Sequence, residues 1–247
     1  MAKPKLKDNE RWDDLELDGL GVIQCENEYS FTSDAVLLAN YIKSGHKDKC
    51  IELCSGSGVI SIIMGYKKKP KSMTLVEIQE SQADRSKRSM IANEIDADIL
   101  CSKFQGVHSL VGKYAFDVCY ANPPYRPITL EASLINSIAL STHEVEMNLE
   151  ELVFEVEKLL KFGGKFFMVY TASRLAELME LLRKYSLEPK SLTMVHPKAN
   201  KPAELVLLTA VKGGKPGIIV EPAIIQKDDN NQDTEIMRAI YNTKAKS

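Results

Sequence analysis

Residues 50–64 read Cys-Ile-Glu-Leu-Cys-Ser-Gly-Ser-Gly-Val-Ile-Ser-Ile-Ile-Met, and this stretch carries the strongest fold signal in the chain. It joins an apolar, strand-like run to a helix-like run through the turn Ser55-Gly56-Ser57-Gly58. Glycines in such a turn let the backbone bend tightly and let a ligand approach the start of the helix. The third glycine of the dinucleotide fingerprint is missing, so this stretch by itself fits a plain strand-to-helix turn equally well.

Strand-like and helix-like runs alternate along most of the chain. The periodicity predicts seven strands, at 50–54, 73–77, 99–102, 116–121, 165–170, 191–196 and 204–212, and helices at 59–66, 79–94, 149–161 and 174–185. Such alternation predicts an α/β fold with a mostly parallel sheet and helices on both faces. Pro197 to Pro202 is too short for a crossover helix, so we expect the last two strands to form an antiparallel hairpin.

The composition is that of an ordinary soluble protein. With 247 residues, 44% hydrophobic and 27% charged, the chain is long enough for one large domain. We expect a lead-in segment, residues 1–40, packed on a core domain, residues 41–247. The formal charge of −2 gives no global basic field, so a nucleic-acid partner would have to meet local patches. The sequence shows neither a signal peptide nor a membrane-length apolar run, so we expect a cytoplasmic protein with no membrane partner.

The sequence gives no sign of a metal site. The five cysteines, at 25, 50, 54, 101 and 119, form no CxxC pair and mostly lie in apolar runs. We interpret them as small buried hydrophobic residues and not as zinc ligands or disulfide partners. A GxxxxGK[ST] loop and an HExxH helix are both absent, which disfavours triphosphate chemistry and a zinc helix.

Glu77 stands at the end of the second predicted strand, about twenty residues after the glycine turn. A carboxylate at this position can accept hydrogen bonds from both ribose hydroxyls of an adenosine-containing cofactor. A solvated glutamate at a strand end is the alternative, although it would not explain the spacing. Among small nucleoside cofactors, S-adenosylmethionine best fits this acid and turn together with the motif that follows the fourth strand.

That motif is Asn122-Pro123-Pro124-Tyr125. Two prolines lack backbone N–H groups and hold the chain in a stiff turn that presents acceptors. The Asn122 side-chain carbonyl and the Pro123 main-chain carbonyl could accept both N–H bonds of a planar amino group, such as adenine N6, cytosine N4 or a glutamine amide. Tyr125 offers a ring on which a base could stack. A strand-terminating turn with a packed tyrosine is the bland alternative.

These residues resemble the Asn-Pro-Pro-Tyr class I methyltransferases, and within them the bacterial tRNA1(Val) adenine N6-methyltransferases. The resemblance extends over about residues 10–242, because Trp12 to Gln24, Phe31 to Ala39 and Lys212 to Gly217 are also similar to segments of that family. It implies a Rossmann-like class I methyltransferase fold, S-adenosylmethionine as the cofactor, and methylation of adenine-37 in the anticodon loop of tRNA1(Val).

The resemblance also implies roles for individual residues. The catalytic residues would be Asn122, Pro123, Pro124 and Tyr125. The cofactor would contact Thr32, Asp34, Glu52, Cys54, Ser55, Gly56, Ser57, Gly58, Glu77, Ile78 and Asn122. The turn from Phe31 to Asp34 would close over the methionine end of the cofactor, although Thr32-Ser33-Asp34 is equally good chemistry for capping a helix.

The chain departs from the family in two places. Residues 102–105 carry no carboxylate where many relatives have an acid able to contact the cofactor's adenine. The run before His143-Glu144 lacks an arginine, and we expect that pair to be structural or to orient RNA instead of acting as an acid and a base. Lysines at 67, 68, 69, 71, 198 and 201 could meet phosphates or form solvated faces.

Other functions use the same motifs. A protein-glutamine N5-methyltransferase acting on release factors shares the acceptor chemistry, but such relatives carry an extra helical domain before the glycine turn, where this chain has only about fifty residues. An rRNA amino-group methyltransferase and a catalytically silent scaffold that binds S-adenosylmethionine or RNA are further alternatives.

Overall fold

The computed structural model describes residues 4–26, 30–124 and 148–241. Tyr125, His143 and Glu144 lie outside these described residues. The strands are β1 Glu10–Asp14, β2 Gly21–Cys25, β3 Lys49–Leu53, β4 Ser72–Glu77, β5 Asp98–Cys101, β6 Phe116–Ala121, β7 Leu160–Thr171, β8 Leu187–Lys198, β9 Leu205–Lys212, β10 Ile219–Val220 and β11 Ile224–Lys227. The helices are α1 Ser33–Tyr41, α2 Val59–Lys67, α3 Glu80–Ala92, α4 His108–Val111, α7 Leu149–Leu159, α8 Leu175–Lys184 and α9 Glu235–Tyr241, with a 3-10 turn at Ala172–Arg174.

The central sheet confirms the predicted α/β class. Its strands lie in the order β10-β8-β9-β7-β6-β3-β4-β5, and β11 also pairs with β8. Neighbours from β7 to β5 are parallel, whereas β9 runs antiparallel to both β7 and β8, which confirms the C-terminal hairpin. Among the described residues the sheet has nine strands where the sequence predicted seven, because the short strands β10 and β11 add to the free side of β8.

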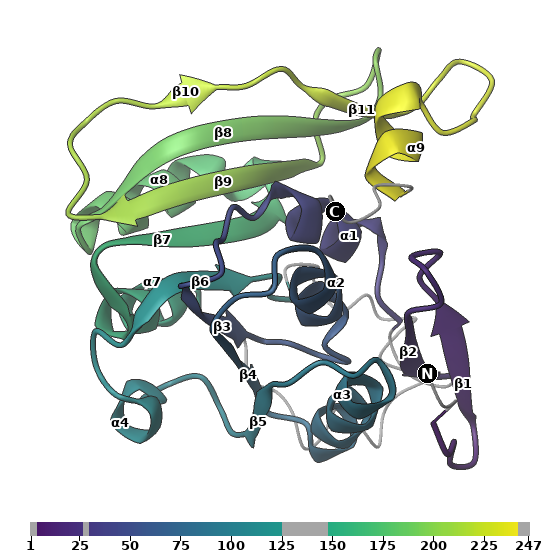
Figure 1. Cartoon of the computed structure of the whole chain (residues 1–247). Coiled ribbons are helices and arrows are strands. Elements are labelled where there is room, and N and C mark those ends of the chain that lie inside the picture. The colour runs from purple at the N-terminus through teal and green to yellow at the C-terminus, as the bar shows by residue number, and fades with distance from the viewer. Residues whose placement is uncertain (1–3, 27–29, 125–147, 242–247) are drawn as a thin grey trace.

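Helices pack on both faces of the sheet (Figure 1). Alternate side chains of β7 point to opposite faces: Phe167 joins the cluster under α1 and α2, and Phe166 joins the cluster under α7 and α8. Helix α7 shows why its segment folds onto the sheet. Five apolar side chains at helical spacing are buried along one side of it, namely Leu149, Leu152, Val153, Val156 and Leu159. Burying each stabilises the fold by roughly 1.5–3 kcal/mol.

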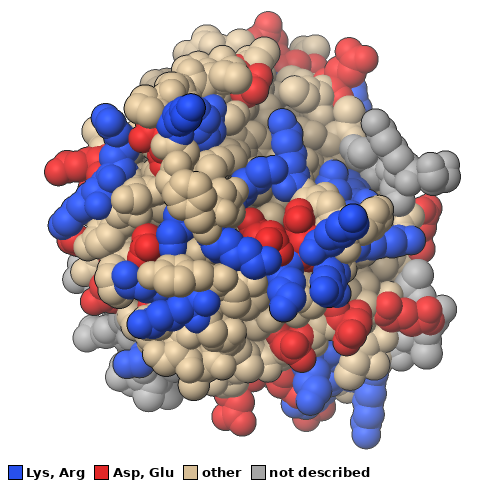
Figure 2. All heavy atoms as spheres, turned by 60° about the vertical axis from the view of Figure 1, so that its left-hand side comes forward, with Lys and Arg blue, Asp and Glu red and all other residues tan. Residues whose placement is uncertain are grey.

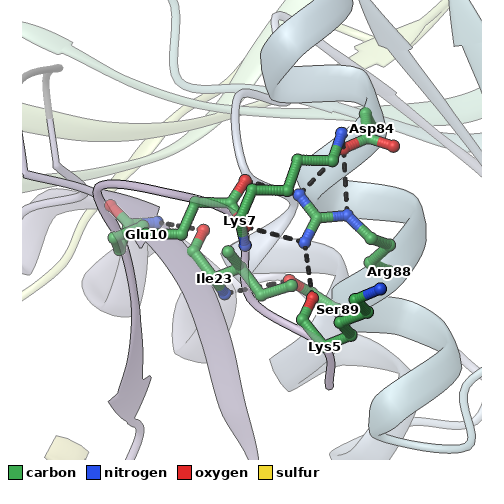
Figure 3. A network of polar contacts seen from close by, with 8 residues as sticks. Lys5, Lys7, Glu10, Ile23, Asp84, Arg88 and Ser89 are labelled. Atoms are coloured by element: carbon green, nitrogen blue, oxygen red, sulfur yellow. Dashed lines mark hydrogen bonds and ion pairs between the residues drawn. The ribbon is translucent and has the colours of Figure 1, made fainter.

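The N-terminal segment forms a separate hairpin, β1 and β2, that docks on α3 (Figure 1). Figure 3 shows the polar network at this contact, in which the Arg88 guanidinium donates to Glu10 at 2.5 and 2.8 Å and to Asp84 at 2.9 Å. The backbone N–H of Ile23 donates to Ser89 Oγ at 3.0 Å. These bonds fix the hairpin against the core. The division of the chain at residue 40 stays a prediction.

The order of the strands reverses between β3 and β6, since β4 and β5 follow on one side and β6 and β7 on the other. In open parallel sheets, ligands bind outside the carboxyl ends of the strands at such a reversal. We call the side of the sheet at which β3, β4, β6 and β7 end the carboxyl edge, and the opposite side the amino edge. Within the described residues, none of the helices has the length and apolar character required to cross a membrane.

Candidate cofactor and methyl-transfer site

Three neighbouring strands are in register at the carboxyl edge: Leu53 of β3 pairs with Val76 of β4 and with Ala121 of β6. The next residue is Cys54 in the segment from β3, Glu77 in β4 and Asn122 in the segment from β6. These three residues therefore leave the sheet side by side, with the backbone of Glu77 and Asn122 roughly 10 Å apart. The structure thus brings the predicted ribose acid, the glycine turn and the Asn-Pro-Pro motif to one place.

The turn after β3 is held in a conformation that its glycines permit. The φ angles of Gly56 and Gly58 are +54° and +81°, in the left-handed region that favours glycine, and Cys54 also has a positive φ of +57°. A Cβ atom on Gly58 would lie 2.5 Å from Ser86 Oγ, whereas one on Gly56 would meet no atom within 4 Å. Gly58 is thus needed for packing against α3, and Gly56 leaves open space in front of the turn.

Glu77 ties this turn to the end of β4. Its Oε2 accepts the Gly56 N–H at 2.8 Å and its Oε1 accepts the Gln79 N–H at 2.9 Å. The side chain is buried, and each of its carboxylate oxygens accepts a backbone hydrogen bond. Ile78 follows with 42% of its surface exposed, so an apolar side chain borders the carboxylate. An acid flanked by an apolar surface suits a ribose with an attached base.

Glu52 lies one residue before the end of β3 and is only 1% exposed. Its Oε2 accepts the Ser61 hydroxyl, which is also 2.7 Å from the Tyr120 hydroxyl. Glu52 Oε1 is buried without a hydrogen-bond partner among the described residues. Burial raises the pKa of this carboxyl to about 8, and the negative charge of Glu77 contributes to the rise. A buried carboxyl of this kind would be stabilised as an anion by a bound cation.

The Asn-Pro-Pro segment begins directly after β6. Asn122 is partly exposed, Pro123 is buried and Pro124 is exposed. The peptide after Ala121 therefore leaves the sheet with the Asn122 side chain still accessible. The predicted acceptor residues Asn122 and Pro123 lie within the described part of the chain, next to the glycine turn, while the predicted stacking role of Tyr125 stays a prediction.

Thr32 and Asp34 stand at the start of α1. Thr32 occupies the N-cap position, but its side chain makes no capping hydrogen bond, and Asp34 is buried. The side-chain cap that Thr32 could provide is therefore not formed. The Ala35 N–H instead donates to the backbone Thr32 O at 3.1 Å. The hydroxyl of Thr32 is not committed to holding the helix.

Gln24 is a residue that the sequence reasoning missed. Its side chain is buried, donates to Ser57 Oγ at 2.7 Å and accepts the Phe31 N–H at 3.0 Å. One amide thus joins β2 to the glycine turn and to the segment that leads into α1. The only signal in the sequence was a polar residue inside an apolar strand, which predicts a buried hydrogen bond but not its partners.

The segment after β5 lies beside the end of β4 and lacks the acid that many relatives carry there. The Ser102 N–H donates to Glu77 O at 2.9 Å, Phe104 is buried, and Gln105 donates to Glu151 at 3.0 Å. The Ser102 hydroxyl donates to Lys103 O at 3.0 Å, so both hydrogen-bond donors of Ser102 are engaged within the protein.

The prediction of buried cysteines holds for Cys50 and Cys119, whereas Cys25 and Cys54 are partly exposed and Cys101 is exposed; all five are free thiols. Burial raises the pKa of Cys50 to about 12 and raises that of Cys119 well above its usual value. Among the described residues, no group of three or more His, Cys, Asp or Glu side chains is arranged to hold a metal ion.

A family model described as the methyltransferase small domain matches residues 27–186. The chain belongs to the methyltransferase small domain family. The match covers the glycine turn, Glu77 and Asn122, so the three features at the carboxyl edge all lie within the region that defines this methyltransferase.

Curated relatives carry a more specific name. This methyltransferase is 26% identical over 222 residues to the tRNA1(Val) (adenine(37)-N6)-methyltransferase of Dyadobacter fermentans, with 85% of this chain and 89% of the relative covered. It is 22% identical over 212 residues to the protein of the same name from Pseudoalteromonas translucida, with 86% and 88% covered.

Solved structures show the same fold. A predicted O-methyltransferase of Agrobacterium tumefaciens superposes with a TM-score of 0.69 at 18% identity, covering 87% of this methyltransferase and 98% of that chain. The TYW2 protein of M. jannaschii, solved in complex with AdoMet, superposes with a TM-score of 0.58 at 11% identity, covering 84% and 87%. At such identities the likeness concerns the fold, and it confirms the Rossmann-like methyltransferase class.

Proposed function

We propose that this methyltransferase transfers the methyl group of S-adenosylmethionine to N6 of adenine in tRNA, and that its target is adenine-37 of tRNA1(Val). One structural observation carries the chemical part of this proposal: the glycine turn, Glu77 and Asn122 leave three adjacent strands in register at the carboxyl edge. The choice of RNA is supported by the names of curated relatives that match most of the chain. Such a substrate implies a cytoplasmic enzyme that binds the anticodon loop.

The residues present suit the cofactor. Glu77 would accept the ribose hydroxyls, the open space in front of Gly56 leaves room beside the turn, and Glu52 would meet the cationic amino group of the methionine part. Thr32 and Asp34 would border that same end. When bound, S-adenosylmethionine supplies a methyl group on a sulfonium, which needs only a correctly aligned lone pair to accept it.

Asn122 and Pro123 would align that lone pair. The amino nitrogen of adenine is a poor nucleophile because its lone pair is delocalised into the ring. If Asn122 Oδ1 and Pro123 O accept its two N–H bonds, the nitrogen becomes more tetrahedral and its lone pair leaves the plane of the ring. The alkylated nitrogen is acidic enough to lose its extra proton to water. No side chain is then required as a general base.

The test is a transfer assay with methyl-labelled S-adenosylmethionine, an unmodified tRNA1(Val) transcript, 16S and 23S rRNA, and a release factor. We expect label in the tRNA alone. Label in the release factor and none in RNA would establish the glutamine N5-methyltransferase instead, label in rRNA would redirect the substrate, and no label anywhere while cofactor still binds would indicate a scaffold.

A further inference from the structure

Six lysines gather at the amino edge of the sheet, on the side opposite the proposed reaction. They come from two loops, residues 43–49 after α1 and residues 67–71 after α2, and we call them the amino-edge lysine cluster: Lys43, Lys47, Lys49, Lys68, Lys69 and Lys71. The two loops are joined, since the Lys71 N–H donates to Asp48 O at 2.9 Å and His46 Nδ1 lies 3.1 Å from Lys69 O. The cluster is therefore one surface.

The charges of this cluster are compensated only in part. Asp48 inside it accepts the Gly45 N–H at 2.8 Å, and Asp117 beside it accepts the backbone N–H of Lys49 at 2.9 Å. Within the described part of the chain none of the six lysines forms an ion pair, whereas Lys161 and Lys212 at the same edge each pair with a carboxylate. Five of the six are exposed and Lys68 is partly exposed.

The neighbouring Lys67 reflects the same positive surroundings. Its ammonium donates to Asn40 Oδ1 at 2.7 Å, and its pKa is lowered to about 8, first by burial and then by the charge of Lys68. Three carboxylates, Glu94, Asp96 and Asp98, lie with Lys69 and Lys71 around an adjoining groove of about 290 Å³. Lys69 and Lys71 therefore border carboxylates on this side, and the most uniformly basic part of the proposed surface is the part formed with Lys43, Lys47 and Lys68.

Figure 2, which brings forward the side of the molecule where the parallel strands begin, shows many lysine and arginine side chains there, with acidic side chains among them. The whole chain has a net charge of only −2, so this concentration is local. Local basic patches are the electrostatic footprint of RNA-binding proteins without a global basic field. The hairpin lysines at the carboxyl edge are a weaker candidate, because β11 pairs beside Lys198 and runs directly into Asp228 and Asp229.

Helix α2 connects the cluster to the proposed site. It begins after Gly58, in the glycine turn, and ends at Lys67, where the cluster starts. The nine residues of α2 span about 14 Å. An RNA whose target base lies at Asn122 therefore has to extend only a little farther than the length of one β-strand to reach the lysines. A double-stranded stem that continues from the anticodon loop toward the amino edge would cover this distance.

We propose that the amino-edge lysine cluster binds the phosphate backbone of the stem next to the target loop of the substrate RNA. This inference rests on the proposed function and adds to it where the RNA is held. The contact is electrostatic and independent of sequence, so it contributes affinity and orientation while the loop provides specificity. The competing explanation is that the lysines only complement the C-terminal ends of α1 and α2, which would stabilise the fold without touching RNA.

The experiment compares two triple variants with the same change in charge. One is Lys68→Glu, Lys69→Glu, Lys71→Glu, and the control is Lys87→Glu, Lys113→Glu, Lys165→Glu, three exposed lysines outside the two loops. Lys113 and Lys165 lie elsewhere along the amino edge, so the control separates the cluster from the edge as a whole. For both we would measure thermal unfolding, S-adenosylhomocysteine affinity, and the KM and salt dependence of binding with a full-length unmodified tRNA1(Val) transcript and with a short single-stranded oligonucleotide of its anticodon loop.

We expect the cluster variant alone to raise the KM for the full tRNA by about tenfold or more and to flatten the slope of log affinity against log salt by about 2 to 3. Its KM for the loop oligonucleotide and its cofactor affinity should match the control. Equal KM and equal slope for the two variants on a tRNA that the wild type methylates would overturn this inference, as would a loss confined to thermal stability. A wild type that methylates no tRNA would instead overturn the proposed function.

Discussion

At the scale of single residues, Asn122 carries the chemistry that we propose. Asn122→Ala removes one of the two acceptors, so we expect the methyl-transfer rate to fall roughly 100-fold or more, as for loss of one aligned polar group in other active sites. The affinity for S-adenosylhomocysteine, measured by calorimetry, should change little. Asn230→Ala, the same substitution at an exposed position between β11 and α9, is the control and should transfer methyl groups normally. A variant at Asn122 that keeps its full rate would contradict the acceptor mechanism.

The buried carboxyl of Glu52 should make the stability of the fold depend on pH. Its carboxyl is buried and its pKa is raised from 4.5 to about 8. Between these values the folded protein retains a proton that the unfolded chain loses, so this residue's contribution makes the fold less stable as pH rises. Glu52→Gln, which cannot ionise, should therefore gain stability relative to the wild type between pH 5 and 8, by on the order of 1.4 kcal/mol for each pKa unit of the window.

Chemical denaturation of the apo-protein and of Glu52→Gln at several pH values measures this difference. A constant offset between the two proteins from pH 5 to 8 would show that Glu52 does not titrate in the way its burial implies. The same variant should bind S-adenosylhomocysteine more weakly above pH 8, because the ionised carboxylate is the form that would meet the ligand's ammonium group.

Substitutions at the two glycines of the turn distinguish the energetic cost of steric overlap from the cost of backbone strain. Both adopt positive φ, but only a Cβ on Gly58 would collide with Ser86 Oγ. Gly58→Ala should therefore destabilise the fold by about 2–5 kcal/mol, and Gly56→Ala by about 1–2 kcal/mol from strain alone. Urea unfolding of both variants would show this order, and the reverse order would indicate that the turn is packed differently.

Sequence spacing placed Glu77 at the end of the strand that follows the glycine turn, and the structure adds a direct hydrogen bond between Glu77 and that turn. The spacing works because consecutive parallel strands end at the same edge of a sheet. It could not predict the role of Gln24, which depends on how the N-terminal hairpin docks, nor the lone buried oxygen of Glu52, which depends on what surrounds it.

At the scale of elements, the β1–β2 hairpin is expected to support the cofactor turn through Gln24. Gln24→Leu keeps a similar volume but removes the bonds to Ser57 and Phe31, leaving buried polar groups without partners. We expect S-adenosylhomocysteine affinity to fall by about tenfold and stability by about 1–3 kcal/mol.

Glu10→Gln is the matched variant on the same hairpin, because it weakens the ion pair with Arg88 and does not touch the turn. It should lower stability without changing the affinity for S-adenosylhomocysteine in the same calorimetric titration. Equal losses of affinity in both variants would mean that hairpin docking in general, and not the Gln24 amide, supports the turn.

The differences between the predicted and the observed helices and strands have identifiable causes. β7 begins at Leu160, five residues before the predicted start, and it runs through Gly163 and Gly164, where its register shifts against β6. α7 ends at Leu159 because Leu160 already has extended backbone angles. β10 has two exposed residues and shows no periodicity that could have predicted it.

At the scale of the whole molecule, the sheet separates two functions that we assign to opposite edges. The carboxyl edge collects the glycine turn, Glu77 and Asn122, and the amino edge collects the lysine cluster. The strands were predictable from sequence because their apolar runs are buried between two layers of helices. The sequence named Lys68, Lys69 and Lys71 as possible phosphate contacts, but it could not group them with Lys43, Lys47 and Lys49, because the two loops meet only through the fold.

The most direct test of the central claim is mass spectrometry of nuclease digests of an unmodified tRNA1(Val) transcript after incubation with the protein and S-adenosylmethionine. We predict a mass increase of one methyl group on the fragment that contains adenine-37, and N6-methyladenosine on complete digestion to nucleosides. A transcript with guanine at position 37 should stay unmodified. Methylation of that control, or no N6-methyladenosine in the natural transcript, would contradict the account.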